Sequence, residues 1–401
     1  MHKSAHRTLT ACAFAAGLLA GAATAQAQDK VVIGFMTDMS SVYADAEGKD
    51  GVVAIQMAID DFGGKVLGKP IQLLSADHQN QADIAAAKTR EWIDTAGATM
   101  IFGGTNSATA LAMAKVAQDK KRVFFDSGAG TPALTNEYCS PYTVHYDYDT
   151  VELARGTGGA VVDEGGKSWF FLTADYTFGH SLEDDTARVV KEKGGTVLGS
   201  VRHPLNASDF SSFLLQAQNS KAQVLGLANA GGDTINSIKA AREFGIQKTM
   251  RMAGLLVQLS DVHSLGLQTA QGMLMANTWY WDMNDASRAW AKRFFQKTKR
   301  MPTELHAADY SATMTYLKAV QAAGTIDADQ VMAKLKSTPI DDFDGKGVIR
   351  PDGRYVHDVY LVQVKTPAES KYPWDYLKVV KTLPGEQIFN TKAESKCPLW
   401  K

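Results

Sequence analysis

Two short polar turns, each following a run of apolar residues, constrain this chain more than any other feature of its sequence. The apolar runs 100–102 (MIF) and 123–125 (VFF) are typical of short buried strands, and residues 108–118 between them have the composition of a helix. In a right-handed β-α-β crossover, the turns that follow both strands lie at the same carboxyl edge of one parallel sheet. The sequence therefore places the turns 103–107 (GGTNS) and 127–131 (SGAGT) beside one crevice.

Both turns have the composition of an anion-binding site. Each offers backbone N–H groups, hydroxyl side chains and a helix N-terminus, which together favour a ligand such as a carboxylate. The alternative is that glycine and serine serve only as turn formers in ordinary loops. A single turn of this kind favours that alternative, whereas two on neighbouring strands favour a ligand site.

The alternation of strands and helices predicts an α/β fold with two doubly wound lobes, each built on a parallel sheet. Residues 31–135 alternate predicted strands with predicted helices, and residues 169–253 repeat the pattern. A length of 401 residues also exceeds that of a typical single domain. We therefore expect two lobes in one chain.

The segments after residue 275 indicate how the lobes are connected. Helical patterns at 286–297, 307–323 and 328–336 follow one another without an intervening strand, so they must cover a sheet that is already built. The chain is thus expected to return to the first lobe, and several crossings of this kind make a stiff hinge. The predicted boundaries are 28–147 and 277–357 for lobe 1, and 148–276 and 358–401 for lobe 2.

The N-terminus carries the features of a secretory signal peptide. Lys3 and Arg7 precede the apolar run 9–20, and small residues then lead to Ala27, so residues 1–27 are predicted to be removed on export. The run is too short for a good membrane span, and no other apolar stretch is long enough. A periplasmic protein that is not membrane-inserted is expected. The formal net charge of −1 gives no indication of nucleic-acid binding.

Cys139 and Cys397 are the cysteines that remain after export. In an exported chain such a pair most simply forms one disulfide, which ties the C-terminal tail to the first half of the chain. Two buried thiols are the alternative.

The order and spacing of these features resemble those of the leucine/isoleucine/valine-type periplasmic binding proteins of ABC transporters. The resemblance covers nearly the whole mature chain. The features that carry it are the signal peptide, Tyr43 in the turn after the first strand, the turns 104–107 and 127–131, and residues 71–79, 174–179 (ADYTFG) and 310–325. It implies two lobes joined by three crossovers, which close over a small ligand and present it to an inner-membrane permease. It also implies a monomer without cofactor, metal or catalytic step.

The resemblance implies roles for individual residues. In the amino-acid binders of this family the first-lobe turns hold the ligand carboxylate, and the matching positions are Ser107, Ala129, Gly130 and Thr131. A second-lobe tyrosine covers the ligand. The full set of expected ligand-binding residues is Tyr43, Asn106, Ser107, Ala129, Gly130, Thr131, Tyr176, Asn229, Leu255 and Trp279.

One departure from the family pattern bears on the ligand. The amino-acid binders carry an acidic residue in the turn after the fourth second-lobe strand, and the matching residues 253–257 (AGLLV) contain none. An ammonium group there would lose its countercharge. The aromatic run 279–281 (WYW) offers a stacking wall, or else belongs to the core. We therefore predict a carboxylate without an α-amino group, favour an aromatic or phenylpropanoid acid, and place the chain in the aromatic-compound-uptake branch. Asp175 or Asp233 is a possible replacement for the missing charge, so an amino-acid ligand stays open.

Other chemistries find little support in the sequence. It has no G-x-S-x-G elbow, P-loop or H-E-x-x-H motif, and its histidines are not spaced as metal pairs. Residues 128–133 match a loose G-x-G-x-x-A pattern, but the first β-α turn, where a dinucleotide fingerprint belongs, lacks it. An enzyme is therefore not expected. A sensor module of the same fold remains an alternative that pocket residues do not distinguish from a transport protein.

Overall fold

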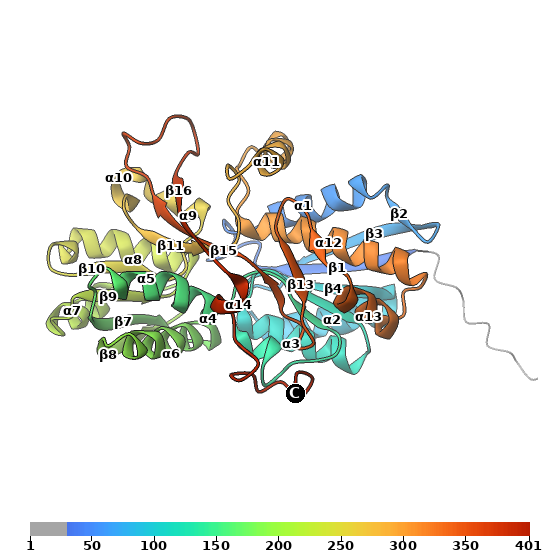
Figure 1. The fold of residues 1–401 in the computed structure, drawn as a ribbon, viewed down its shortest axis with the longest axis horizontal. Coiled ribbons are helices and arrows are strands. Elements are labelled where there is room, and N and C mark those ends of the chain that lie inside the picture. The colour runs from blue at the N-terminus through green and yellow to red at the C-terminus, as the bar shows by residue number, and fades with distance from the viewer. Residues whose placement is uncertain (1–29) are drawn as a thin grey trace, which may run out of the picture.

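Two sheets, one in each lobe, organise the computed structural model, which describes residues 30–401 (Figure 1). The predicted signal peptide lies outside the described residues. The lobe 1 sheet has the strand order β2-β3-β1-β4-β5-β6 and is parallel except for the short β2. Its strands are β1 (Val31–Thr37), β2 (Lys65–Val66), β3 (Lys69–Asp77), β4 (Ala98–Gly103), β5 (Val123–Asp126) and β6 (Thr143–His145).

Helices cover both faces of the lobe 1 sheet because β1 is apolar on both sides. Val31, Ile33 and Phe35 pack in one core with α1, α12 and α13, while Val32 and Met36 pack in another with α2 and α3. The late helices therefore return to lobe 1, as predicted. The helices are α1 (Gly48–Asp61), α2 (Ala82–Ala96), α3 (Ser107–Asp119), α12 (Glu304–Ala323) and α13 (Ala328–Ser337), and α11 (Asp285–Thr298) lies against α1.

The lobe 2 sheet is wholly parallel, with the order β10-β9-β7-β8. Alternate residues of its central strand again pack on opposite faces, with Trp169 and Phe171 on one and Phe170 and Leu172 on the other. This sheet confirms the second doubly wound lobe. The elements are β7 (Ser168–Ala174), β8 (Thr196–His203), β9 (Val224–Ala228), β10 (Arg251–Gly254), α4 (Thr150–Leu153), a π-helix (Ala154–Gly158), α5 (Gly159–Asp163), α6 (Thr177–Glu192), α7 (Ser211–Asn219), α8 (Gly231–Glu243), α9 (Leu259–Leu265) and α10 (Leu267–Ala270).

Three passages of the chain join the lobes: one after β6, one after β11 and one between β14 and β15. Two small antiparallel sheets flank these crossings, in the orders β11-β15-β16 and β12-β13-β14. The elements are β11 (Leu274–Asn277), β12 (Ile340–Asp341), β13 (Lys346–Ile349), β14 (Tyr355–His357), β15 (Val359–Val364), β16 (Leu377–Leu383) and α14 (Gly385–Ile388). No helix in residues 30–401 is long and apolar enough to span a bilayer.

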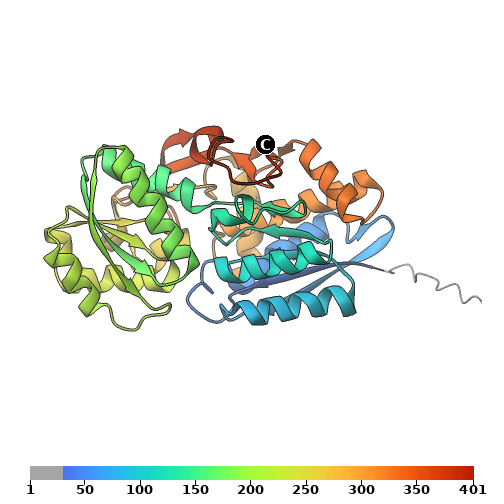
Figure 2. The same cartoon turned by 90° about the horizontal axis from the view of Figure 1, so that it is seen from below.

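The C-terminal tail after β16 contacts both lobes and lies beside their junction (Figures 1 and 2). Arg155 of lobe 2 donates to the carbonyl of Phe389 at 2.7 Å. The end of the tail is held on lobe 1, where Cys397 forms the predicted disulfide with Cys139 over a Cα–Cα distance of 5.7 Å. The predicted assignment of all residues 358–401 to lobe 2 therefore differs from the structure at the end of the tail.

Candidate ligand-binding site

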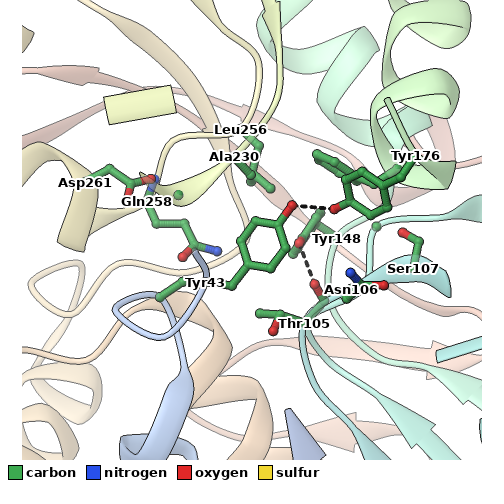
Figure 3. A pocket seen from close by; sticks show the side chains of 15 residues that line it. Tyr43, Thr105, Asn106, Ser107, Tyr148, Tyr176, Ala230, Leu256, Gln258 and Asp261 are labelled. Atoms are coloured by element: carbon green, nitrogen blue, oxygen red, sulfur yellow. Dashed lines mark hydrogen bonds between the residues drawn. The ribbon is translucent and has the colours of Figure 1, made fainter. Parts of the chain in front are cut away.

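A small pocket lies between the lobes, where the predicted turns of lobe 1 face lobe 2 (Figure 3). Its open space is about 20 Å³, room for about one water molecule. The two lobes thus lie close together around this space. The lining residues are Tyr43, Ala46, Thr105, Asn106, Ser107, Gly128, Gly130, Tyr148, Tyr176, Phe178, Ala230, Gly231, Leu256, Gln258 and Asp261.

The first turn ends at the N-terminus of α3 with its capping group already engaged. Asn106 has a φ of 84°, and its side-chain oxygen accepts from the N–H groups of Ala108 at 2.9 Å and Thr109 at 3.2 Å. Ser107 follows as the first residue of the helix. Its Oγ is buried and has no hydrogen-bond partner among the described residues. A buried hydroxyl without a partner costs about 1–3 kcal/mol, so Ser107 is the polar group of this turn that remains available to a ligand.

Of the residues expected from the second turn, Gly130 lines the pocket, whereas Ala129 and Thr131 do not. Gly128 and Gly130 line the pocket. Ala129 is buried and does not line it, and its N–H is already used in a hydrogen bond to Asp126 Oδ2 at 3.1 Å. Thr131 does not line it either: its hydroxyl accepts from the N–H of Ala133 and caps a short 3₁₀ helix (Pro132–Thr135).

Aromatic rings close most of the remaining wall. Tyr148 and Phe178 approach Gly130 so closely that a Cβ there would lie 2.9 and 2.8 Å from their ring atoms. Tyr148 donates its hydroxyl to the Gly128 carbonyl at 2.7 Å. Tyr43 of lobe 1 and Tyr176 of lobe 2 meet hydroxyl to hydroxyl at 2.5 Å (Figure 3). Burial raises the pKa of both tyrosines, which therefore stay neutral donors.

The loop that carries Tyr43 makes a second contact between the lobes. Asp38 accepts from the N–H groups of Ser41 and Tyr43, both at 2.9 Å, and so shapes the loop. The carbonyl of Val42 then accepts from the N–H of Gly232 in the first turn of α8 at 3.0 Å. Two hydrogen bonds thus join the lobes beside the pocket: one between the hydroxyls of Tyr43 and Tyr176, and one between the backbone groups of Val42 and Gly232.

The start of α9 supplies an acidic residue that the sequence reasoning missed. Asp261 lines the pocket and accepts from the N–H of Gln258 at 3.0 Å in a capping box. Burial raises the pKa of the Asp261 carboxyl to about 7. The residues 253–257 indeed lack an acid, but the pocket wall continues beyond them. The signal that was available is the spacing of Gln258 and Asp261, an N-cap and its third helical residue.

The chain matches a known protein family: residues 30–371 fit the family model described as periplasmic binding protein. The chain belongs to this family. Its members are ligand-binding components of ABC transporters rather than a class of enzymes, which agrees with the predicted absence of a catalytic step and places the family in the periplasm.

Solved structures and curated relatives agree with this membership. A periplasmic binding protein from Burkholderia mallei is 65% identical, with a TM-score of 0.92, over 93% of this chain and 100% of that one. A branched chain amino acid ABC transporter periplasmic ligand-binding protein from Burkholderia xenovorans LB400 is 42% identical, with a TM-score of 0.82 and the same coverage. A Leu/Ile/Val-binding protein homolog 6 from Brucella melitensis is 24% identical over 93% of this chain and 96% of its own length. The predicted type I periplasmic binding protein fold is confirmed.

Within this periplasmic binding protein, two lobe 2 residues expected to bind ligand lie behind the pocket wall. Asn229 is fully buried, and its side chain bonds Thr234 Oγ1 at 2.7 Å and His203 Nε2 at 3.1 Å. The next residues of the same turn, Ala230 and Gly231, line the pocket instead. Leu255 is likewise in the lobe 2 core, and its neighbour Leu256 faces the pocket.

The aromatic run 279–281 belongs to the core, which was one of the two interpretations of the sequence. The Trp279 indole donates to Ser287 Oγ at 3.0 Å and packs edge-on against Trp290. Tyr280 and Trp281 both donate to the carbonyl of Trp374 at 3.1 Å. The run therefore supports the long loop between β15 and β16, and Trp279 provides no stacking wall in the pocket.

Proposed function

We propose that this protein is the solute-binding component of an ABC transporter that captures a small carboxylate between its lobes and delivers it to an inner-membrane permease. The observation that carries the proposal is the buried Oγ of Ser107 at the N-terminus of α3, which lies inside the interlobe pocket and has no hydrogen-bond partner in residues 30–401. A carboxylate oxygen accepts from a hydroxyl at a helix N-terminus, where the helix dipole also favours negative charge.

The body of the favoured ligand is aromatic. Four rings line the pocket, and aromatic side chains pack well against a flat ligand. The hydroxyls of Tyr43 and Tyr176, which now bond each other, would turn to the ligand as the lobes part to admit it. An aromatic or phenylpropanoid acid uses all of these groups. The rings are those of Tyr43, Tyr148, Tyr176 and Phe178.

An α-amino acid is the second candidate, and Asp261 is the observation that favours it. An ionised Asp261 offers the ammonium group the countercharge that residues 253–257 do not. The name of the Burkholderia xenovorans relative points the same way. Figure 3 shows Asp261 and Ser107 on opposite sides of Tyr43, so that an α-amino acid would have to sit across the position of that ring.

Matched ligand pairs distinguish the two candidates. Phenylalanine and 3-phenylpropanoate, and leucine and 4-methylpentanoate, differ only in the ammonium group, and calorimetry on the mature protein gives their affinities. Tighter binding of the acids without an amino group supports the aromatic-acid proposal, and tighter binding of the amino acids supports the second candidate. Binding of none of a wider panel of carboxylates would refute the anion site itself.

The pH dependence provides a second criterion. Because the pKa of Asp261 is raised to about 7, this carboxyl is protonated in mildly acidic solution. An ammonium ligand should bind more tightly as the pH rises through about 7, whereas a plain carboxylate should not. Delivery, as opposed to sensing, is tested by uptake of the bound acid in cells with and without the gene.

A further inference from the structure

Two buried carboxyl groups meet behind the anion-binding turns of lobe 1. Glu47 immediately precedes α1, and Asp309 lies on α12, far away in the sequence. The Oγ of Ser127 lies 3.1 Å from Glu47 Oε1 and 2.8 Å from Asp309 Oδ1, so one hydroxyl, which carries a single proton, bridges the two carboxyl groups. The two groups also interact electrostatically. Their exposed fractions are 1% and 0%.

This pair contacts both turns that form the lobe 1 wall. Glu47 Oε2 accepts from the N–H of Thr105 at 3.1 Å and from the hydroxyl of Thr37. Thr105 lines the pocket in the first turn, and Ser127 precedes the lining residue Gly128 in the second. A Cβ at Gly104 would lie 2.0 Å from Glu47 Oε2, so the first turn is built around the carboxylate.

The environment allows one negative charge on the pair. Two carboxylates in contact and out of water cannot both ionise, and burial raises the pKa of both groups. Glu47 accepts hydrogen bonds from Thr37, Thr105 and Ser127, which favours its ionised form. The Ser127 hydroxyl is the one donor near Asp309, and no group among residues 30–401 donates to its Oδ2.

Among residues 30–401, no cation is one of the main groups that act on Glu47 or Asp309. The other acidic groups that act on this pair are Asp126 and Asp147. His306 bonds the backbone carbonyl of Glu47 at 3.0 Å, and burial lowers its pKa to about 3, so its ring is neutral. Arg354 acts on Asp126 and Asp147 rather than on the pair.

We propose that Glu47 and Asp309 form a singly protonated pair, with the proton on Asp309, which positions the two anion-binding turns for ligand capture. Asp309 is then a positioning residue that touches no ligand. The inference rests on the proposed carboxylate site, because it assigns the pair a role in keeping Ser107 and the glycine turns aligned while limiting the negative charge behind them.

The decisive experiment compares Asp309→Asn with Asp309→Leu. The asparagine amide is neutral and still donates to Glu47, so the affinity for the tighter of 3-phenylpropanoate and phenylalanine should stay within about twofold of wild type. Leucine leaves the Glu47 carboxylate without its donor, so the affinity should fall by about tenfold or more. Asp344→Asn removes another buried acid, outside the pocket lining, and serves as the matched control, with unchanged affinity.

Infrared difference spectroscopy tests, without any ligand, whether Asp309 carries the proton of the pair. The carbonyl band of a protonated carboxyl should be lost in Asp309→Asn relative to wild type at neutral pH. This measurement tests the inference even if Asp309→Leu does not fold. Retention of that band, equal losses of affinity in both Asp309 variants, or full affinity in a folded Asp309→Leu would each overturn the inference. Lost infrared intensity in a protein that binds no carboxylate would refute the proposed function and, with it, the role in capture, while leaving the shared proton established.

Discussion

The two walls of the pocket are built on different principles. Apart from Tyr43 and Ala46, the lobe 1 wall consists of turns and a helix N-terminus that are held from behind by buried carboxyl groups, so most of its shape is set by backbone. The lobe 2 wall consists of side chains from the starts of α6 and α9 and the turn before α8. Comparison of the two suggests that lobe 1 anchors the common carboxylate, whereas lobe 2 sets which ligand is accepted and completes closure.

Gly104→Ala should reduce ligand affinity more than any other variant in this series, because it displaces the backbone of the lobe 1 wall. Its Cβ would lie 2.0 Å from Glu47 Oε2 and 2.5 Å from Thr37 Oγ1, and overpacking of this kind costs about 1–3 kcal/mol of stability. The displaced turn should also abolish carboxylate binding in calorimetry. Wild-type affinity would show that the turn is not the anchor. Gly159→Ala is the matched control, because Gly159 has a helical φ of −59°, lies outside the pocket lining, and its Cβ would first meet the flexible side chain of Lys193 at 3.2 Å.

Ser107→Ala and Thr131→Ala separate an anchoring hydroxyl from a capping one. Ser107→Ala should weaken binding by about 1–3 kcal/mol through loss of a charge-assisted hydrogen bond. The family resemblance assigned the same role to Thr131. In the structure Thr131 caps a 3₁₀ helix, so its loss should lower the melting temperature and leave affinity nearly unchanged. The opposite ranking of the two affinities would restore the role that the resemblance implied.

Asp261→Asn tests whether the buried carboxyl in the lobe 2 wall has a raised pKa, through the pH dependence of the protein's stability. The pKa of Asp261 is raised to about 7 from an ordinary value near 3.8. The folded state therefore holds this proton more tightly than the unfolded state, and the contribution of Asp261 to stability is lost as the pH rises between these values. The variant should show a shallower decline of the melting temperature from about pH 4 to about pH 7. Identical slopes would place Asp261 outside this titration.

Tyr43→Phe and Tyr176→Phe should have the smallest effects of this series. Each removes one hydroxyl from the contact between the lobes, worth about 0.5–1.5 kcal/mol. Because both variants remove the same bond, the double variant should lose little more affinity than either single one, as a double-mutant cycle by calorimetry will show. Additive losses would mean that the two hydroxyls act separately on the ligand.

Local signals were sufficient to predict the fold and part of the pocket. The apolar runs and the glycine-rich turns at residues 100–131 predicted that the two turns lie together at one crevice, and residues of both turns line the pocket, because short strands and turns follow from periodicity and turn chemistry. Tyr148 and Asp261 were missed, since they come from a hinge crossing and a helix start whose positions depend on how the lobes meet. Trp279 was misplaced as a pocket residue because an aromatic run looks the same in a core as in a pocket.

The sequence by itself determined that two doubly wound lobes form, that the chain returns to lobe 1, and that two turns lie at one sheet edge. Those properties depend on side-chain periodicity and on the handedness of β-α-β crossovers, which neighbouring residues specify. Only the tertiary structure decided which polar groups remain free for a ligand. The side chains of Asn106 and Thr131 cap helices, whereas the hydroxyl of Ser107 has no hydrogen-bond partner in the part of the chain that the structure describes. Which donor bonds which acceptor depends on the groups that the fold brings close to each other. The type of a residue alone therefore does not predict whether its polar atoms remain free.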